Sequence, residues 1–160
     1  CPLKTGTDMT EPAEPPTGET LSPEAAAAAA LAADAARERD AAKQADRLRA
    51  TVALGYAGQQ DVAEELRALL TDTGFNVGAA GALAMLGDPA ARPVLVQQLK
   101  TSSLRVSAAL SLRRLEPTLD AVPLLPELMA ALESEKDTER INVAETVLLL
   151  TGPTSLAERD

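Results

Sequence analysis

The sequence predicts an all-α protein, an α-solenoid of about seven or eight helices arranged as three or four helix pairs. Apolar residues recur at helical spacing along most of the chain after residue 22. One segment also recurs with a period near 30 residues, which is typical of stacked helix pairs. Hydrophobic residues make up 46% of the 160, yet they include one Phe, one Tyr and no Trp. A core of small aliphatic side chains suits closely stacked helices.

The stretch from Asn76 to Leu99 shows one unit of the repeat. Its first half carries apolar residues at the spacing of one helix face. Gly87 is expected to end this helix, because glycine accepts the left-handed conformation found at helix C-termini. Asp88 and Pro89 suit the N-cap and first position of a second helix. Neither helix can bury much alone, so the unit needs neighbours.

Copies of this unit lie on both sides of it. Asn76 stands 29 positions after Arg47 and 29 before Arg105, and Arg140 follows 35 positions later. A basic ladder for an acidic partner is one interpretation of this column. The interpretation we favour is structural, with these side chains capping or bridging to acids in the loop of the adjacent repeat, such as Asp72, Asp88 or Asp137.

The pattern "VR..AA.AL..LGDP.A.P.L...L" is similar to the HEAT-like repeat first associated with phycobilisome lyases. The best match runs from Phe75 to Leu99, with Leu-Gly-Asp-Pro at 86–89 and Pro93 in the following helix. The resemblance covers roughly residues 45–152, although Asn76 replaces the usual Arg and Glu116-Pro117 replaces Gly-Asp. It implies a solenoid fold, and most proteins of this family are protein-binding scaffolds.

The resemblance also implies that the "VR..AA" helices line the concave face. Taking the polar positions of Leu104–Leu115 as outward gives Ser107, Ser111 and Arg114. Their equivalents in the repeat form three columns: Arg49, Gly78, Ser107 and Asn142; Ala53, Ala82, Ser111 and Thr146; Tyr56, Met85, Arg114 and Leu149. Tyr, Arg and Met are enriched at protein interfaces. We therefore predict a protein-binding strip of Arg49, Tyr56, Gly78, Met85, Ser107, Ser111, Arg114, Asn142 and Thr146. The alternative is an ordinary solvated face, with binding at the loops or on the convex side.

Two glycines within the first helix of the central unit need an explanation, since Gly costs about 1 kcal/mol relative to Ala inside a helix. Close approach of a neighbouring helix to Gly78 and Gly81 is one explanation, and close approach of a partner chain is the other. Residues 23–57 also allow two interpretations. Local propensity favours one long helix, whereas the repeat register favours a break between Asp40 and Asp46, and we expect the break.

The N-terminal stretch resembles that of a mature bacterial lipoprotein. The only cysteine is Cys1, and residues 2–21 are rich in Pro, Thr, Glu and Gly. This resemblance implies a covalent lipid on Cys1 and a membrane anchor in the bacterial cell envelope, periplasmic or surface-exposed. The alternative is that the sequence happens to begin at a cysteine that carries no lipid. We expect residues 1–21 to form a flexible linker, 22–153 the repeat domain and 154–160 a polar tail.

The composition disfavours several other classes of function. The chain has no His and one Cys, so the commonest general base and cysteine-based zinc sites are missing. Lys and Arg number 15 against 24 Asp and Glu, for a net charge of −9, which disfavours nucleic-acid binding. No catalytic motif and no run of 18 apolar residues occurs, so neither an active site nor a membrane-spanning helix is expected.

We therefore predict a non-catalytic, lipid-anchored scaffold that binds other proteins. Such a chain would serve as an accessory subunit or assembly factor of a membrane or envelope complex, with no metal, cofactor or small-molecule substrate beyond the lipid on Cys1. A bilin-lyase-like enzyme or ligand-binding protein is one alternative. A soluble regulatory adaptor is another.

Overall fold

The computed structural model describes residue 18 and residues 20–153. These contain seven α-helices, four short 3₁₀ turns and no strand, which confirms the all-α prediction. Cys1, most of the predicted linker 1–21 and the tail 154–160 lie outside the described residues. No helix in the described part combines the length and apolar character that crossing a membrane requires. The chain divides into two units, Cys1–Ala42 and Lys43–Asp160.

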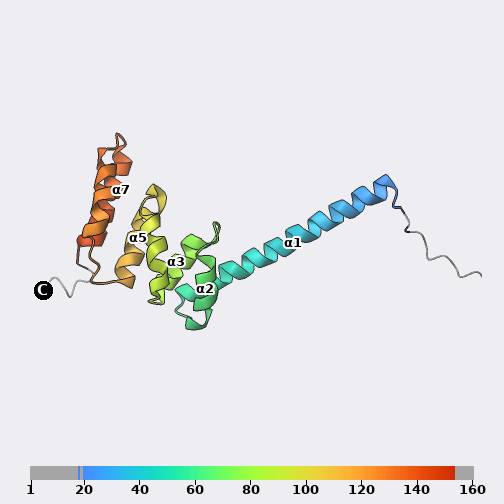
Figure 1. The fold of residues 1–160 in the computed structure, drawn as a ribbon, viewed down its shortest axis with the longest axis horizontal. Helices are drawn as coiled ribbons and strands as arrows, with labels where there is room; N and C mark the ends of the chain where they lie inside the picture. The colour runs from blue at the N-terminus through green and yellow to red at the C-terminus, as the bar shows by residue number, and fades with distance from the viewer. Residues whose placement is uncertain (1–17, 19, 154–160) are drawn as a thin grey trace, which may run out of the picture. The chain divides into compact units, whose positions relative to one another are not determined.

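The first helix, α1, runs without interruption from Pro23 to Tyr56 (Figure 1). The expected break between Asp40 and Asp46 is therefore wrong. Between Glu24 and Leu54 the chain has no Gly or Pro and many Ala, and this local propensity outweighed the repeat register. The Oγ of Ser22 accepts a hydrogen bond from the Ala25 N–H at 3.2 Å and so caps the first turn.

In the unit Cys1–Ala42, the described side chains are exposed apart from a half-buried Ala35. Leu31 is the largest apolar residue among them in this part of α1 and is 70% exposed. Helix formation here depends on alanine propensity and on local ion pairs such as Arg37 with Asp34, one turn apart.

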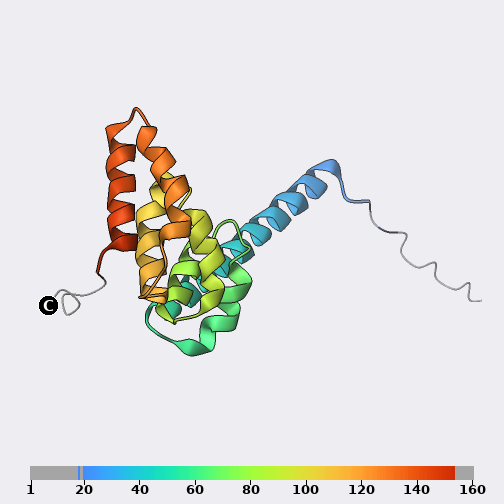
Figure 2. The same cartoon turned by 60° about the vertical axis from the view of Figure 1, so that its left-hand side comes forward.

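The unit Lys43–Asp160 is a stack of helices in two layers (Figures 1 and 2). The first layer holds α1 from Lys43 onward, α3 (Asn76–Met85), α5 (Ser102–Leu115) and α7 (Asp137–Thr151). The second holds α2 (Ala63–Leu69), α4 (Arg92–Gln98) and α6 (Leu125–Ala130). Helix α5 packs between α3 and α7, while α4 contacts both α3 and α5. Helix pairs therefore stack as a solenoid.

Short 3₁₀ turns adjoin the helices of the second layer. They are η1 (Gln60–Val62), η2 (Pro89–Ala91), η3 (Val122–Leu124) and η4 (Ala131–Glu133). The first three lead directly into α2, α4 and α6, and η4 follows α6. The prolines of this layer lie in or just after such turns, where a missing N–H costs little.

The core is a line of leucines, with a nearly or fully buried one on each helix from α2 to α7. Among the least exposed side chains are Leu66, Leu83, Leu95, Leu112 and Leu150. Alanines fill the space between them, so neighbouring helices approach closely. Each buried leucine stabilises the fold by roughly 1.5–3 kcal/mol relative to an exposed one.

The repeat register appears directly in the backbone at the helix ends. Gly58 and Gly87, which are equivalent in the repeat, adopt left-handed φ angles of 87° and 73°. The N–H of Gln59 donates to the Leu54 carbonyl at 3.0 Å, and that of Asp88 donates to the Leu83 carbonyl at 2.9 Å. These paired bonds close both helices in the same way, as the sequence predicted for Gly87.

Candidate protein-binding face

The structure places the predicted strip on the helices of the first layer, and most of its residues reach the surface. Tyr56 and Met85 are 45% and 39% exposed, although both are large and apolar. Arg49, Ser107 and Arg114 are also exposed, and Gly78, Ser111 and Asn142 are half-buried.

Thr146 is the exception, because its exposed fraction is 0%. Its Oγ1 donates a hydrogen bond to the Asn142 carbonyl at 2.7 Å, within its own helix. Predicting it as a surface residue was wrong. Residues four apart differ by about 40° around a helix, which turns Thr146 toward the neighbouring helix, although Ala53 of the same column is exposed and Ser111 is half-buried. The equivalent Ala82 is buried for the same reason.

The two glycines of α3 allow α1 to lie close against it. A Cβ added at Gly78 would lie 3.0 Å from Cγ1 of Val52. A Cβ at Gly81 would collide with the ring and hydroxyl of Tyr56, which lies over this position. Close approach of a neighbouring helix thus explains both glycines. Gly81 also determines where Tyr56 rests on the strip.

Two hollows lie along the strip, and one contains a residue that the sequence analysis missed. A cavity of about 280 Å³ is lined by Arg49, Val52, Gly74, Phe75 and Gly78. A larger one of about 390 Å³ is lined by Leu110, Arg113, Arg114, Pro117, Leu149 and Pro153. Leu110 is 49% exposed and lies one turn from both Ser107 and Arg114. That spacing was the signal that could have found it.

The basic column has a structural role, as we expected. Arg105 is only 4% exposed, and its Nε donates to the Leu99 carbonyl at 2.8 Å. Its Nη1 donates to Glu139 Oε1 at 2.7 Å and to Asn142 Oδ1 at 2.9 Å. The Oδ1 atom of Asn142 therefore already accepts a hydrogen bond within the stack and is less available to a partner protein. Hydrogen bonds from Ser102 and Arg105 lower the pKa of Glu139.

The other arginines of this column also find acids. Arg47 Nη2 lies 3.7 Å from Glu65 Oε1. Arg140 pairs with Asp137, but both belong to α7 and lie three residues apart, so this pair does not join adjacent repeats as we expected. Glu65 and Glu139 belong to helices of the stack, whereas we expected acids in loops. A helix side chain reaches these arginines because consecutive helices pack side by side.

Asp88 joins the central unit to the preceding helix pair. Its Oδ2 lies 2.6 Å from Arg67 Nη2, and its Oδ1 accepts from the Ala90 N–H at 2.9 Å. Burial opposes ionisation of Asp88. The hydrogen bonds from Arg67 and Ala90, with the charge of Arg67, outweigh it and lower the pKa of this carboxyl. The predicted N-cap thus also holds two repeats together.

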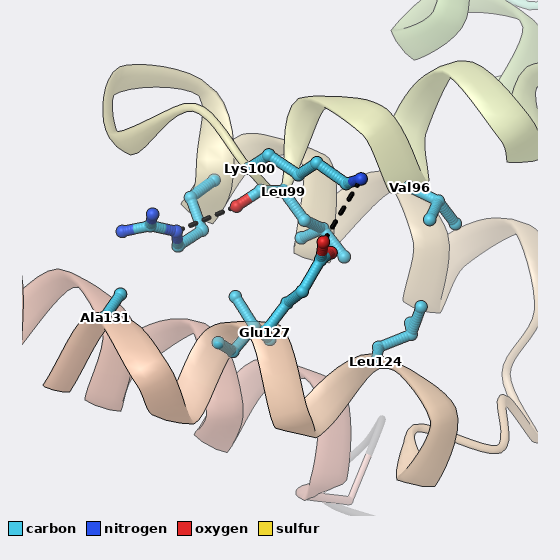
Figure 3. A pocket seen from close by; sticks show the side chains of 8 residues that line it. Val96, Leu99, Lys100, Leu124, Glu127 and Ala131 are labelled. Carbon is cyan, nitrogen blue, oxygen red and sulfur yellow. Dashed lines mark hydrogen bonds and ion pairs between the residues drawn. The ribbon is translucent and has the colours of Figure 1, made fainter.

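A further pocket of about 230 Å³ lies on the other layer, between α4 and α6 (Figure 3). Val96, Leu99 and Leu124 form part of an apolar wall, and Lys100 and Glu127 reach toward each other across it at 3.2 Å. The ammonium and the carboxylate already satisfy each other. Within the residues that the structure describes, no three His, Cys, Asp or Glu side chains gather as metal ligands.

Comparison with protein families matched one description, HEAT repeats, over residues 34–113. The match covers half of the chain and ends at the last turn of α5. No curated protein and no solved structure matches the chain significantly.

Proposed function

The chain belongs to the HEAT-repeat family, and we propose that it binds a partner protein along the first layer of its helix stack. HEAT repeats commonly mediate protein–protein interaction and are typically non-catalytic. We define the binding strip as Arg49, Tyr56, Gly78, Met85, Ser107, Leu110, Ser111 and Arg114. It keeps the predicted residues except Asn142, whose side chain accepts a hydrogen bond from Arg105, and the buried Thr146, and it adds Leu110.

One observation carries the proposal: in the unit Lys43–Asp160, most of the exposed large apolar side chains lie on helices of the first layer. Among its described residues, those on first-layer helices are Leu54, Tyr56, Val77, Met85, Leu110, Ile141 and Leu148. The rest of the stack exposes Val122 and Met129. Tyr and Met with nearby Arg are residue types that provide much of the binding energy at protein interfaces.

Single alanine substitutions on the binding strip test the proposal. Partner proteins would be captured from mild-detergent extracts of the native membrane, identified by mass spectrometry and then titrated as purified proteins. We expect Tyr56→Ala, Met85→Ala and Arg114→Ala each to weaken the partner's Kd by about five- to thirtyfold, or roughly 1–2 kcal/mol. Val122→Ala and Met129→Ala are matched controls on exposed apolar residues elsewhere. Unchanged affinity in all three strip variants would reject the strip.

We further propose that the module is anchored to a bacterial envelope membrane by a lipid on Cys1 and assists assembly of an envelope complex. A single cysteine followed by a Pro-, Thr- and Glu-rich stretch supports this. Two or more acyl chains give stable anchoring, since each buried CH₂ contributes about 0.8 kcal/mol. Mass spectrometry of the native protein tests it. We expect an acylated Cys1 in the membrane fraction, and an unmodified Cys1 on protein outside the membranes would contradict the anchor.

A further inference from the structure

The groove between α5 and the end of α7 combines apolar walls with positive charge. It is lined by Leu110, Arg113, Arg114, Pro117, Leu149 and Pro153, with a volume of about 390 Å³. Among the residues that the structure describes, no acidic side chain lines it, although the chain carries a net charge of −9. Leu110 is half exposed at this position. The groove can therefore take an apolar side chain and an anionic group together.

The two arginines of the groove keep unused hydrogen-bond donors. Arg113 Nη2 donates to the Gly152 carbonyl at 2.6 Å, while its Nε is buried and finds no acceptor among the described residues. Arg114 is exposed and forms no hydrogen bond or ion pair within the described part of the chain. By contrast, Arg67, Arg92 and Arg105 each pair with a carboxylate of the stack.

Gly152 and Pro153 give the groove a fixed rim. A Cβ added at Gly152 would lie 2.6 Å from the Leu148 carbonyl oxygen, so only glycine fits here as the chain leaves α7. The hydrogen bond from Arg113 holds the Gly152 carbonyl in place, and Pro153 lines the groove directly. The rim thus presents a defined surface before any ligand binds, which lowers the entropic cost of binding.

We infer that this groove anchors an extended acidic segment of the partner protein. An apolar side chain of that segment packs between Leu110 and Leu149, and a neighbouring carboxylate accepts hydrogen bonds from the guanidinium of Arg114. Arginine and carboxylate form strong, directional pairs. The acidic remainder of the chain repels such a segment, so the charge pattern favours this groove over other surfaces. This inference rests on the proposed protein-binding function and names the chemistry of its partner.

Selection from a phage-displayed library of random ten-residue segments tests the inference without knowledge of the partner. The full chain is immobilised, and the Kd of each selected segment is measured as a synthetic peptide against four chains. These are the unchanged chain, Arg114→Glu, Leu110→Asp and Arg39→Glu. Arg39 is an exposed arginine of α1 that does not line the groove and serves as the matched control. Circular dichroism and thermal unfolding establish that each variant is folded.

We expect the selected segments to carry Asp or Glu within a few residues of Leu, Ile, Met or Phe. Arg114→Glu and Leu110→Asp should each weaken their binding at least about tenfold, while Arg39→Glu changes it less than about twofold. Binding should also weaken as salt is raised. Selected segments that are neutral or basic, or that bind the Arg114→Glu chain as well as the unchanged one, would overturn the inference.

The same segments are also titrated against the Tyr56→Ala, Met85→Ala and Leu156→Ala/Glu158→Ala chains, which separates this inference from the proposed function. Segments weakened by Tyr56→Ala or Met85→Ala but not by Arg114→Glu would refute the groove and leave the binding strip standing. A library that yields no binding segment would count against both. If the Leu156→Ala/Glu158→Ala chain binds the segments about tenfold more tightly than the unchanged chain, the chain's own residues after Pro153 compete for the groove. That result would overturn a partner segment as its occupant.

Discussion

Replacing Gly55 by alanine should destabilise the protein, although the same change in an exposed helix is stabilising. Gly55 lies in the last turn of α1, where alanine is favoured over glycine by up to about 1 kcal/mol. A Cβ at this position would lie 2.6 Å from Leu66 Cδ1 and 2.8 Å from Ala82 Cβ. Ordinary contact begins near 3.4 Å. Both neighbours are fully buried, so neither can move aside easily.

The size of the effect follows from the balance of these two terms. Overpacking a closed core typically costs about 1–3 kcal/mol. Subtracting the gain in helix propensity leaves a net loss of up to about 2 kcal/mol in the free energy of unfolding. For a domain of this size each kcal/mol lowers the melting temperature by roughly 2–4 °C. The Gly55→Ala chain should therefore melt several degrees below the unchanged protein.

The Gly81→Ala chain is the control, because its obstacle can move. The added methyl meets the ring and hydroxyl of Tyr56, which is partly exposed and can rotate outward. We expect unchanged or increased stability together with a changed fluorescence of Tyr56, which is the chain's only tyrosine and reports without interference from Trp. Urea unfolding followed by circular dichroism measures both variants. A Gly55→Ala chain stabilised by about 1 kcal/mol would refute the close helix contact.

Two further predictions concern the arginine and aspartate that link repeats. Arg105→Ala should lower the free energy of unfolding by about 3 kcal/mol. Arg105→Lys should recover less than half of this loss, because an ammonium lacks the planar fork that reaches Leu99 and Glu139. Full recovery in the Arg105→Lys chain, measured by urea unfolding, would contradict this. The pKa of Asp88 is lowered by folding, so its contribution is present above about pH 4 and lost as the pH falls through its folded pKa. Lowering the pH from about 6 to about 3 should therefore reduce the free energy of unfolding more for the unchanged chain than for Asp88→Asn. Equal losses in the two chains would contradict the ion pair.

Local chemistry explains which parts of the fold were predictable. The helix beginning at Asn76, the left-handed Gly87 and the capping side chain of Asp88 all depend on neighbours in sequence, and the structure has each of them. For α1, the helix propensity of alanine favoured one continuous helix, whereas the repeat register favoured a break. Both signals were visible in the sequence, but their relative strength was not.

The candidate site was less predictable because it depends on contacts between distant residues. Glu139 lies 34 positions from Arg105, and only the packed stack brings its carboxylate to the guanidinium. A rotation of about 40° around the helix decides that Thr146 is buried while Ser107 is exposed. The groove likewise needs Pro117, which follows α5, and Pro153, which follows α7. Columns in a sequence alignment do not contain these distances.

Arg105 also bears on how the stack comes apart. One guanidinium binds the end of α4 and two residues of α7, so three helices share a single cation. In repeat proteins, neighbouring units open separately unless the interface between them is strong. The amide protons of α5 and α7 should then exchange with solvent as one cooperative unit, and the last repeat should not fray independently of the one before it.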